Sequence, residues 1–383
     1  MFTFGIGDIS GGGGAERFFS DLFDEYQQYP KSQFNLFWII DKQSASNLKQ
    51  VGKGLEGKNF LEFALVSNRF KVVLEKWQLL FFILRYRISI VHVPMYNQFY
   101  YAHVRFLGKL PAFMRPALSV NIVDCSLPYC YHDATLPRHE GVVKTYQPLF
   151  ALRSINGYLA WNQNFKDFAT AVPSPVASPY VYAIKSRFCK TQDYFPQEKQ
   201  NVAVFASRLA VFKNTDWYIK AIDLIKKTNP EILKSWKFLV CGDGPLKQEL
   251  VELASALGVN DLIEFRTEPT LFKVLNHSKI FISCQDFDNF PSMSMAEAMA
   301  AGNVIVSRNV GQTNLFVRDQ YNGYLAKEDT VAGIAEALKK ALTDGDKLDE
   351  MASNSVKMMT EVHTVPAFIE QLDEFWNTIY LKA

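Results

Sequence analysis

Two cations follow the first strand expected in the second half of the chain. Arg208 and Lys213 come after the apolar run Asn201–Ala206, with four residues between them. A guanidinium binds phosphate through two N–H groups, and a lysine adds a point charge. Two cations at the end of one strand therefore suit a diphosphate. The alternative is that both are solvated surface charge.

A second candidate site lies in the segment Phe281–Asn309. An apolar strand, Ile280–Ser283, leads into an acidic turn that contains Phe-Pro, and a short helix follows. Glu297 is the one acid of that helix, Gly302 ends it, and the strand Val304–Ser307 comes next. Helix N-termini bind anions, and ligands of open α/β folds bind at the carboxyl ends of strands. The segment therefore predicts a site for a phosphate, with Glu297 in reach of a sugar or ribose hydroxyl.

Two glycine-rich turns precede helices. Gly11–Gly14 follows the expected strand Thr3–Ile6, but Glu16 leaves the dinucleotide fingerprint without its third glycine, and no Gly-Lys-Ser/Thr follows. A nicotinamide, flavin or P-loop site is therefore disfavoured, and the turn either brings backbone N–H groups near an anion or is simply flexible. Gly242–Pro245 is a tight turn that opens a helix, and alone such a turn is usually structural.

The acids Asp286 and Asp288 form an Asp-x-Asp pattern. Carboxylates together with substrate phosphates can hold a divalent cation. Because Arg208 and Lys213 already supply positive charge, a site without metal is the favoured interpretation.

The elements that would position these residues alternate between strand and helix. Residues 171–196 interrupt the alternation with four prolines and little periodicity, and then it restarts. This pattern predicts an α/β fold of two Rossmann-like, doubly wound domains facing across a cleft. The other strands expected are Phe34–Ile40, Ile88–Val93, Ser119–Val123, Tyr158–Trp161, Trp236–Cys241 and Leu262–Arg266, and the longer helices are Ala15–Tyr26, Val72–Arg85, Trp217–Lys227, Leu246–Leu257, Val331–Leu342 and Pro366–Tyr380.

The composition fits two large domains. The chain has 383 residues, is 48% hydrophobic and carries a net charge of +2, so its charge does not argue for a nucleic-acid partner. The five scattered cysteines are expected to be buried thiols of a reducing compartment. The N-terminus does not resemble a signal peptide, and Val72–Ile90 is too charged to span a membrane. That stretch is expected to be a core helix, and the alternative is a helix that also touches a membrane surface.

Taken together, the motifs occur in the order and approximate spacing of a known family. They are Arg208-Leu209 with Lys213, Gly242-Asp243-Gly244-Pro245, Glu297 to Gly302, Gly311, and Asn322-Gly323, and Gly13 to Arg17 matches an N-terminal segment common in the same family. Between Gly11 and Leu325 the chain resembles glycosyltransferase family 4, of the GT-B fold. Each motif is modest in itself, and five in sequence are a strong signal.

The resemblance implies a retaining transferase that uses a UDP- or GDP-linked sugar and needs no metal or other cofactor. It implies an acceptor-binding domain at 1–175, a nucleotide-sugar domain at 176–364, and a last helix, 365–383, that packs back on the first domain. The acceptor would be a glycan or a lipid-linked sugar, and the expected location is the cytoplasm, with peripheral contact at the inner face of a membrane as an alternative.

The resemblance also implies roles for individual residues. Arg208 and Lys213 would hold the diphosphate, Glu297 would bind the ribose hydroxyls, and Arg266 and Thr267 would lie near the base. Gly13, Gly14 and Gly242 would approach the donor closely. The loop Phe290, Pro291, Ser292, Met293 and Ser294 would offer backbone N–H groups.

Two positions depart from the family pattern. The acid expected eight residues before Glu297 is Asn289, and the nearest acid, Asp288, is one residue further away. Either residue could contact the sugar, and Asp288 is slightly favoured. A histidine expected after the strand Ser119–Val123 is replaced by Asp124, so we name Asp124, His132 and Tyr96 as candidates for the acceptor side.

The function expected is retaining sugar transfer in glycan, polysaccharide or glycolipid synthesis. The departures keep open a catalytically silent GT-B protein that binds a nucleotide sugar or a partner. An epimerase or phosphorylase of the same fold is the remaining alternative.

Overall fold

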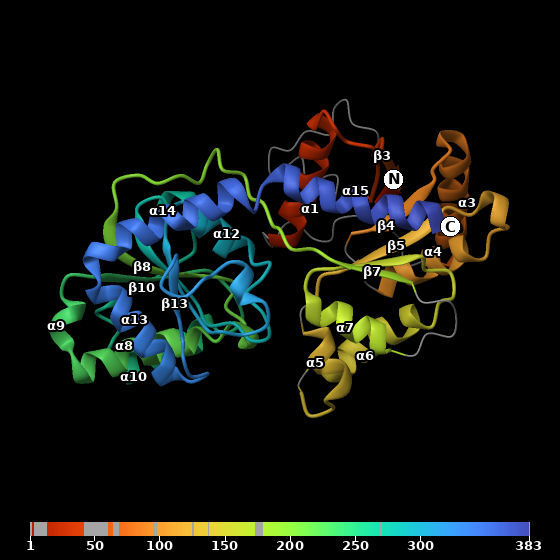
Figure 1. Ribbon diagram of the computed structural model, residues 1–383. Coiled ribbons are helices and arrows are strands. Elements are labelled where there is room, and N and C mark those ends of the chain that lie inside the picture. Colours follow the sequence, from red (N-terminus) through yellow and green to blue (C-terminus); the bar gives the residue numbers. More distant parts are fainter. Residues whose placement is uncertain are drawn as a thin grey trace. The chain divides into compact units, whose positions relative to one another are not determined.

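The protein was analysed as a computed structural model that describes residues 2–3, 14–41, 60–63, 69–94, 96, 98–124, 126–136, 138–172, 179–268 and 270–382. It divides into two compact units (Figure 1). The first comprises residues 1–185 and 366–383, and the second comprises residues 186–365. The two units have the same architecture, because each is a parallel sheet flanked by helices.

The first unit contains a seven-stranded parallel sheet in the order β3-β2-β1-β4-β5-β6-β7. The order reverses between β1 and β4, as in other doubly wound sheets. The strands are β1 (Phe2–Thr3), β2 (Phe37–Asp41), β3 (Phe60–Phe63), β4 (Ile90–Val93), β5 (Ala117–Ile122), β6 (Gly157–Ala160) and β7 (Tyr180–Ala183).

The helices of this unit join the strands, apart from one that comes from the end of the chain. They are α1 (Gly14–Gln28), α3 (Arg69–Tyr86), α4 (Gln98–Gly108), α5 (Leu127–His132), α6 (His139–Phe150), α7 (Gln163–Ala171) and α15 (Val365–Lys382), with the short turn η2 (Ala112–Met114) after α4. The last helix packs against α1, because the rings of Phe18 and Phe368 lie 5.0 Å apart and those of Tyr26 and Trp376 lie 5.5 Å apart.

The second unit contains a six-stranded parallel sheet in the order β10-β9-β8-β11-β12-β13. Figure 1 shows α12 and α14 over one face of this sheet and α8, α10 and α13 over the other. The strands are β8 (Gln200–Ala206), β9 (Lys237–Cys241), β10 (Ile263–Arg266), β11 (Ser278–Ser283), β12 (Val304–Ser307) and β13 (Gly323–Leu325). The helices are α8 (Thr215–Thr228), α9 (Pro230–Leu233), α10 (Lys247–Ala256), α11 (Phe272–Leu275), α12 (Met293–Ala300), α13 (Val331–Thr343) and α14 (Gly345–Glu361). Two short 3-10 turns, η3 (Val211–Lys213) and η4 (Thr313–Leu315), follow β8 and β12.

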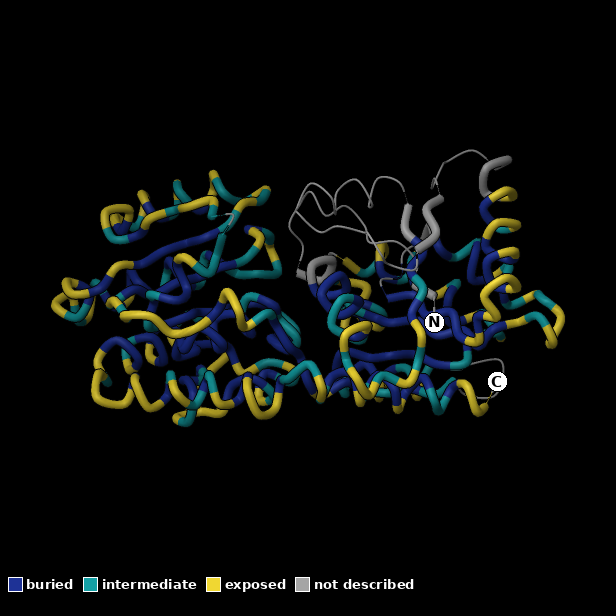
Figure 2. The backbone as a smooth tube through the Cα atoms, turned by 90° about the horizontal axis from the view of Figure 1, so that it is seen from above, coloured by how far each residue is buried: buried dark blue, intermediate teal, exposed yellow. Residues whose placement is uncertain are grey.

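The strands β4, β5, β6 and β12 are buried along their whole length, and the outer sides of the helices with described burial are exposed (Figure 2). In the second unit β8, β9, β11 and β12 carry almost continuous apolar runs, as expected of strands covered on both faces. The described cysteines Cys130, Cys189, Cys241 and Cys284 are buried thiols, and Cys125 lies outside the described residues.

The boundary between the units lies ten residues later than the sequence analysis placed it. The prediction ended the first domain at residue 175, whereas Tyr180–Ala183 forms β7 and pairs with β6 of the first sheet. The prolines around this strand hid it, because the whole stretch was interpreted as a linker. The elements β3, β13, α4, α5, α6, α7, α9 and α14 were also not predicted from the sequence, and the expected strand Thr3–Ile6 lies mostly outside the described residues.

Candidate functional site

The predicted donor residues gather at one edge of the second sheet. The register pairs Ala206 with Cys241, Cys241 with Arg266, and Ser283 with Ser307, so the carboxyl ends of these strands line up. The strand order reverses between β8 and β11, and the loops after these two strands carry Arg208, Lys213 and residues 284–292. Ligands of doubly wound folds bind at such a reversal. The sheet therefore places the predicted residues where a ligand is expected.

The two cations have different surroundings. Arg208 is exposed, and no hydrogen bond or ion pair of its guanidinium is found within the described part of the chain. Lys213 ends η3, and its Nζ donates a hydrogen bond to Oε1 of Gln285 in the loop after β11. Asn214 follows in the left-handed conformation, with φ of 49°. Lys213 is thus held at the reversal point, and Arg208 is open to a ligand.

A buried arginine organises the loop after β11. Arg308 follows β12, and its guanidinium is paired with Asp286 and with Asp329, at 2.8 Å from Nη2 to Oδ2 of Asp329. It also lies over the ring of Trp217, 4.4 Å from the centroid. The hydrogen bonds from Arg308 hold the pKa of the Asp329 carboxyl below its usual value. Sequence reasoning missed Arg308, because nothing in its neighbourhood along the chain marks it.

The carboxylate of Asp286 is bonded to other side chains of the protein. It pairs with Arg308 and accepts a hydrogen bond of 2.7 Å from Nδ2 of Asn214. Among the described residues no group of three or more His, Cys, Asp or Glu side chains could hold a metal ion. The carboxylate of Asp286 is thus engaged with other side chains, and a site without metal stays a prediction.

The structure separates Asp288 from Asn289. The side chain of Asn289 is fully buried: Oδ1 accepts a bond of 2.6 Å from Ser283, and Nδ2 donates to the Arg308 carbonyl at 3.1 Å and to the Thr313 hydroxyl at 2.9 Å. Asn289 is a structural residue, so its prediction as a sugar contact is corrected.

Asp288 has a different set of partners. Its Oδ1 accepts two backbone N–H bonds of 2.9 Å, from Phe290 and from Gln312. The carboxylate thus joins the loop after β11 to the loop after β12.

The loop 290–294 offers fewer N–H groups than expected. The Phe290 N–H is bonded to Asp288, the Ser292 N–H donates to the Asn289 carbonyl at 2.8 Å, and Pro291 has none. The side chain of Phe290 is buried, with its ring 5.0 Å from that of Phe316. Within the described residues, the N–H groups of Met293 and Ser294 at the start of α12 have no acceptor, as is usual for a first helical turn. These two are the candidates for an anion.

Glu297 lies on the second turn of α12 and is 3% exposed. Because desolvation of a carboxylate is costly, a buried carboxylate normally has specific hydrogen bonds or charges that compensate for it. The helix is otherwise built from small and apolar residues that pack on β11, β12 and α14. The role predicted for Glu297 stays a prediction.

At two glycine positions of the motifs, close backbone contacts leave no room for a side chain. A Cβ on Gly242 would lie 2.0 Å from the Ser207 carbonyl oxygen, so the turn after β9 can pack on the loop after β8 only without a side chain. A Cβ on Gly311 would lie 2.4 Å from the Phe287 oxygen and 2.5 Å from Cγ of Asp288, and φ there is +53°. Both glycines therefore shape the edge that carries Arg208 and Asp288.

Arg266 and Thr267, which were predicted to lie near the nucleotide base, are at the carboxyl end of β10, the outermost strand of the second sheet. Arg266 ends β10 and is paired with Glu264, at 2.8 Å from Nη2 to Oε2, and this pairing lowers the pKa of Glu264. Thr267 is exposed and accepts a bond of 2.9 Å from Lys247. Of the N-terminal glycines, Gly14 begins α1 and Gly13 lies outside the described residues.

The candidates for the acceptor side have different surroundings within the first unit. Asp124 is ion-paired with Arg138 at 3.0 Å and accepts hydrogen bonds from Ser126, so it acts as a local structural acid. His132 is exposed and packs against the rings of Tyr131 and Phe168. Tyr96 is buried, its hydroxyl has no partner among the described residues, and burial raises its pKa. Tyr96 and Asp124 follow the paired strands β4 and β5, and no hydrogen bond, ion pair or ring contact joins any two of the three within the described residues.

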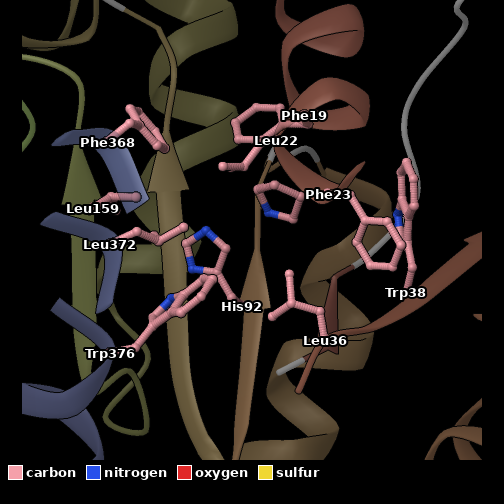
Figure 3. A pocket seen from close by; sticks show the side chains of 11 residues that line it. Phe19, Leu22, Phe23, Leu36, Trp38, His92, Leu159, Phe368, Leu372 and Trp376 are labelled. Atoms are coloured by element: carbon pink, nitrogen blue, oxygen red, sulfur yellow. The ribbon is translucent and has the colours of Figure 1, made fainter. Parts of the chain in front are cut away.

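A small apolar pocket lies within the first unit, between α1, α15 and the sheet (Figure 3). His92 of β4 points into it among the side chains of Phe23, Trp38 and Trp376. His92 is bonded through Nδ1 to the Ser119 hydroxyl at 2.9 Å, and burial lowers its pKa to about 3. The pocket contains no charged group and is part of the packing of the unit.

Comparison with known proteins finds similarity to glycosyltransferases in the second unit. Residues 189–358 match the family model of glycosyl transferases, group 1. An alpha-1,4-N-acetyl-D-galactosaminyltransferase of Campylobacter jejuni is 26% identical over 159 residues, which are 41% of this chain and 43% of that protein. The alpha-D-kanosaminyltransferase of Streptomyces kanamyceticus is 21% identical over 205 residues, or 51% of this chain and 50% of that protein. The chain thus spans half or less of the length of these curated relatives.

Solved structures match the chain over its whole length. A glycosyltransferase of Rickettsia africae superimposes with a TM-score of 0.69 at 13% identity, covering 100% of this chain and 98% of the other. HepE of Anabaena, solved in complex with UDP, superimposes with a TM-score of 0.69 at 14% identity, covering 98% and 99%. The chain has the GT-B fold. The predicted fold class of two Rossmann-like domains is confirmed, and the group 1 match, residues 189–358, lies within the second unit.

Proposed function

We propose that this GT-B protein is a retaining glycosyltransferase of family 4. It would move a sugar from a nucleotide-diphosphate sugar to an acceptor hydroxyl, with the donor bound by the second unit and the acceptor by the first. The observation that carries the proposal is the convergence of Arg208, Lys213 and the start of α12 at the strand-order reversal of a unit that matches glycosyl transferases, group 1.

The residues proposed for the donor site differ in the part of the donor that each would bind. The exposed Arg208 and the positioned Lys213 would bind the diphosphate, and the N–H groups of Met293 and Ser294 would add an uncharged anion contact. Glu297 would accept hydrogen bonds from ribose or sugar hydroxyls. Asp288 would act indirectly, by holding the loops after β11 and β12 together through its two backbone bonds.

The transfer needs no protein nucleophile. The bond between the anomeric carbon and the diphosphate oxygen breaks, and a bond from the acceptor oxygen forms on the same face of the sugar. The acceptor proton goes to the departing diphosphate, so the products are a nucleoside diphosphate and a glycoside. Charge grows on the diphosphate in the transition state, and Arg208 and Lys213 would stabilise it there. We therefore expect transfer without added metal and in the presence of EDTA.

The donor and acceptor classes are proposed from the chemistry and from relatives. HepE binds UDP in its solved complex, and the Campylobacter jejuni relative is named for an acceptor that contains PP-undecaprenol. We propose a UDP- or GDP-linked sugar as the donor and a glycan or a lipid-linked saccharide as the acceptor, in glycan, polysaccharide or glycolipid synthesis.

Nucleotide binding and turnover test the proposal together. We expect UDP or GDP, but not ADP, to raise the melting temperature, because ligand at about a hundred times its Kd stabilises by about 2.7 kcal/mol. We expect Arg208→Ala and Lys213→Ala each to lower donor hydrolysis or transfer by about a hundredfold or more, as removal of one charge-stabilising group does.

Lys220→Ala is the matched control. Lys220 lies on α8 of the same unit, with its side chain 45% exposed in an i,i+4 pair with Asp216. The control should keep both turnover and melting temperature. Full turnover in both site variants would refute the donor site, and nucleotide binding without any transfer or hydrolysis would indicate a catalytically silent protein.

A further inference from the structure

Helix α3 exposes an apolar stripe to solvent. Leu74, Trp77, Phe81 and Leu84 are each between 49% and 67% exposed, and their spacing of three, four and three residues places them on one face of the helix. Val73 and Tyr86 beside them are also about half exposed. Single exposed apolar side chains are ordinary, whereas a contiguous row on one helix marks an interaction surface.

The opposite face of the same helix forms the core contact. Leu79, Phe82 and Ile83 are buried, and the ring of Phe82 lies 5.8 Å from that of Phe37 at β2. The alternative left open by the sequence is that the helix within Val72–Ile90 also touches a membrane, and Leu79–Leu84 is its apolar centre. The structure buries Leu79, Leu80, Phe82 and Ile83 of that stretch and exposes only Phe81 and Leu84, because the helix is apolar on both faces.

The segment that carries the stripe is basic and nearly free of acids. Residues 69–123 contain a single acid, Glu75, which is buried and pairs with His103 of α4 at 3.2 Å. The same residues contain eight cations: Arg69, Lys71, Lys76, Arg85, Arg87, Arg105, Lys109 and Arg115. Five of these, from Arg85 to Arg115, are exposed.

Helix α4 and the turn after it extend this surface. Lys76 of α3 lies over the ring of Phe106 of α4, 5.9 Å from its centroid, so the two helices pack side by side. Phe113, in the turn η2, is 88% exposed and stands between Lys109 and Arg115 in the chain. We call residues 73–87 and 105–115 the α3–α4 surface.

We propose that the α3–α4 surface docks on a lipid bilayer that contains anionic lipids. Exposed Trp, Phe and Leu side chains with a rim of Lys and Arg suit the boundary between headgroups and acyl chains. Each cation near an anionic leaflet adds to binding, and a surface without exposed acids meets no repulsion there. No helix in the described residues is long and apolar enough to cross a membrane, so α3 would lie in the interface plane. The inference goes beyond sugar transfer, and its test needs no activity.

Flotation with large unilamellar vesicles tests the surface. The unaltered protein should float with vesicles of phosphatidylcholine containing about one third phosphatidylglycerol, and bind at least about tenfold less to phosphatidylcholine alone. Binding should weaken with salt, since screening shortens the reach of the cations. Trp77→Ser with Phe81→Ser, and separately Arg85→Glu with Lys109→Glu, should each reduce binding to the anionic vesicles by about tenfold or more.

Exposed apolar residues of the second unit supply the control. Phe195→Ser with Leu224→Ser removes two apolar side chains that are 45% and 36% exposed. This variant should bind anionic vesicles as the parent does. Melting temperatures near that of the parent would show that each variant is folded, and a variant that fails this criterion is replaced by Leu74→Ser with Leu84→Ser.

Fluorescence gives an independent readout. Of the six tryptophans, Trp77 is the one with an indole that is mostly exposed, since Trp38, Trp161, Trp236 and Trp376 are buried and Trp217 is covered by Arg308. Anionic vesicles should therefore shift the tryptophan emission to shorter wavelengths and reduce its quenching by iodide. The Trp77→Phe variant should lack this shift but should still float with the vesicles.

Three outcomes would overturn the proposal. They are absence of flotation with anionic vesicles, equal binding by the parent and both surface variants, and a concentration-dependent dimer that Trp77→Ser with Phe81→Ser abolishes. The last outcome would assign the surface to a second copy of the chain.

Discussion

At the scale of single residues, Asn289 and Asp288 are neighbours with different tasks. The amide of Asn289 makes three hydrogen bonds inside the protein, two as donor and one as acceptor. The carboxylate of Asp288 accepts backbone N–H groups from two loops. An amide is needed where carbonyl oxygens must be satisfied, and an acceptor where N–H groups must be.

We expect Asn289→Asp to destabilise the second unit by about 1–3 kcal/mol, because a carboxylate oxygen would face the Arg308 carbonyl in a buried place. The melting temperature should fall by several degrees. Asp288→Asn keeps an acceptor for Phe290 and Gln312 and should cost less. The opposite order of melting temperatures would contradict these assignments.

His363 is a buried base whose hydrogen bonds fix the tautomer of its neutral form. Its Nε2 lies 2.8 Å from the Leu315 carbonyl, so Nε2 carries the proton and donates it, and Nδ1 accepts from the Arg187 N–H at 3.4 Å. Protonation would place a second N–H against the Arg187 N–H. Burial is the main cause that lowers the pKa of His363 to about 4.

This shift predicts acid destabilisation. The unfolded chain binds the proton near pH 6.5 and the folded chain only near pH 4, so between these values unfolding takes up a proton and stability falls as the pH is lowered. The full effect is up to about 3 kcal/mol. Urea unfolding between pH 7 and pH 4 should show a shallower loss for His363→Gln, and equal slopes for the two proteins would refute the role of His363.

At the scale of elements, the edge of the second sheet depends on loops that approach without side chains. Gly311 lies against the backbone of Phe287 and the carboxylate of Asp288, and Gly242 lies against Ser207. The loops after neighbouring strands are therefore packed on one another. This packing keeps the loops that carry Arg208 and Lys213 in fixed positions.

Gly311→Ala should disturb both stability and nucleotide binding. An alanine at φ of +53° costs about 1–2 kcal/mol, and its Cβ would also displace the 287–288 backbone. Gly258→Ala is the control, since φ there is +65° and no atom lies within 4 Å of the added Cβ. Both variants should melt earlier, and Gly311→Ala should in addition lose the nucleotide-dependent rise in melting temperature. Equal nucleotide shifts would contradict the argument.

At the scale of the whole molecule, the last helix belongs to the first unit although it follows the second in the chain. Trp376 is fully buried, with its ring 5.5 Å from Tyr26 and 5.6 Å from Phe34, and the hydroxyl of Tyr26 donates to Asp373 of the same helix. The first unit therefore cannot complete its core until the end of the chain is present.

Trp376→Ala should destabilise the first unit alone. The loss of a large buried aromatic costs about 3–5 kcal/mol, and Leu381→Ala on the same helix, at 83% exposure, should change stability by less than about 0.5 kcal/mol. Calorimetry should show an earlier transition in Trp376→Ala, while the transition that responds to nucleotide stays in place. A shift of the nucleotide-responsive transition would contradict the division into units.

Much of the fold was predictable because its signals are local. The strands β8, β9, β11 and β12 were located to within a residue or two, since each is an apolar run that ends at a charged residue, a glycine or a turn. β7 was missed because prolines lie close to it, and α14 because its buried face is formed by scattered methionines and one leucine. Periodicity does not say which of several apolar faces is covered.

The sequence by itself determined which residues follow the carboxyl ends of the strands, and so brought Arg208, Lys213, Glu297 and the glycine turns to one edge. Only the tertiary structure decided what each side chain does there. It buried Asn289 and added Arg308 between two acids, and on α3 it turned Leu79 inward and Trp77 and Phe81 to solvent. The reason is physical: strand ends are set by neighbours along the chain, whereas burial and partners are set by elements that are far apart in it.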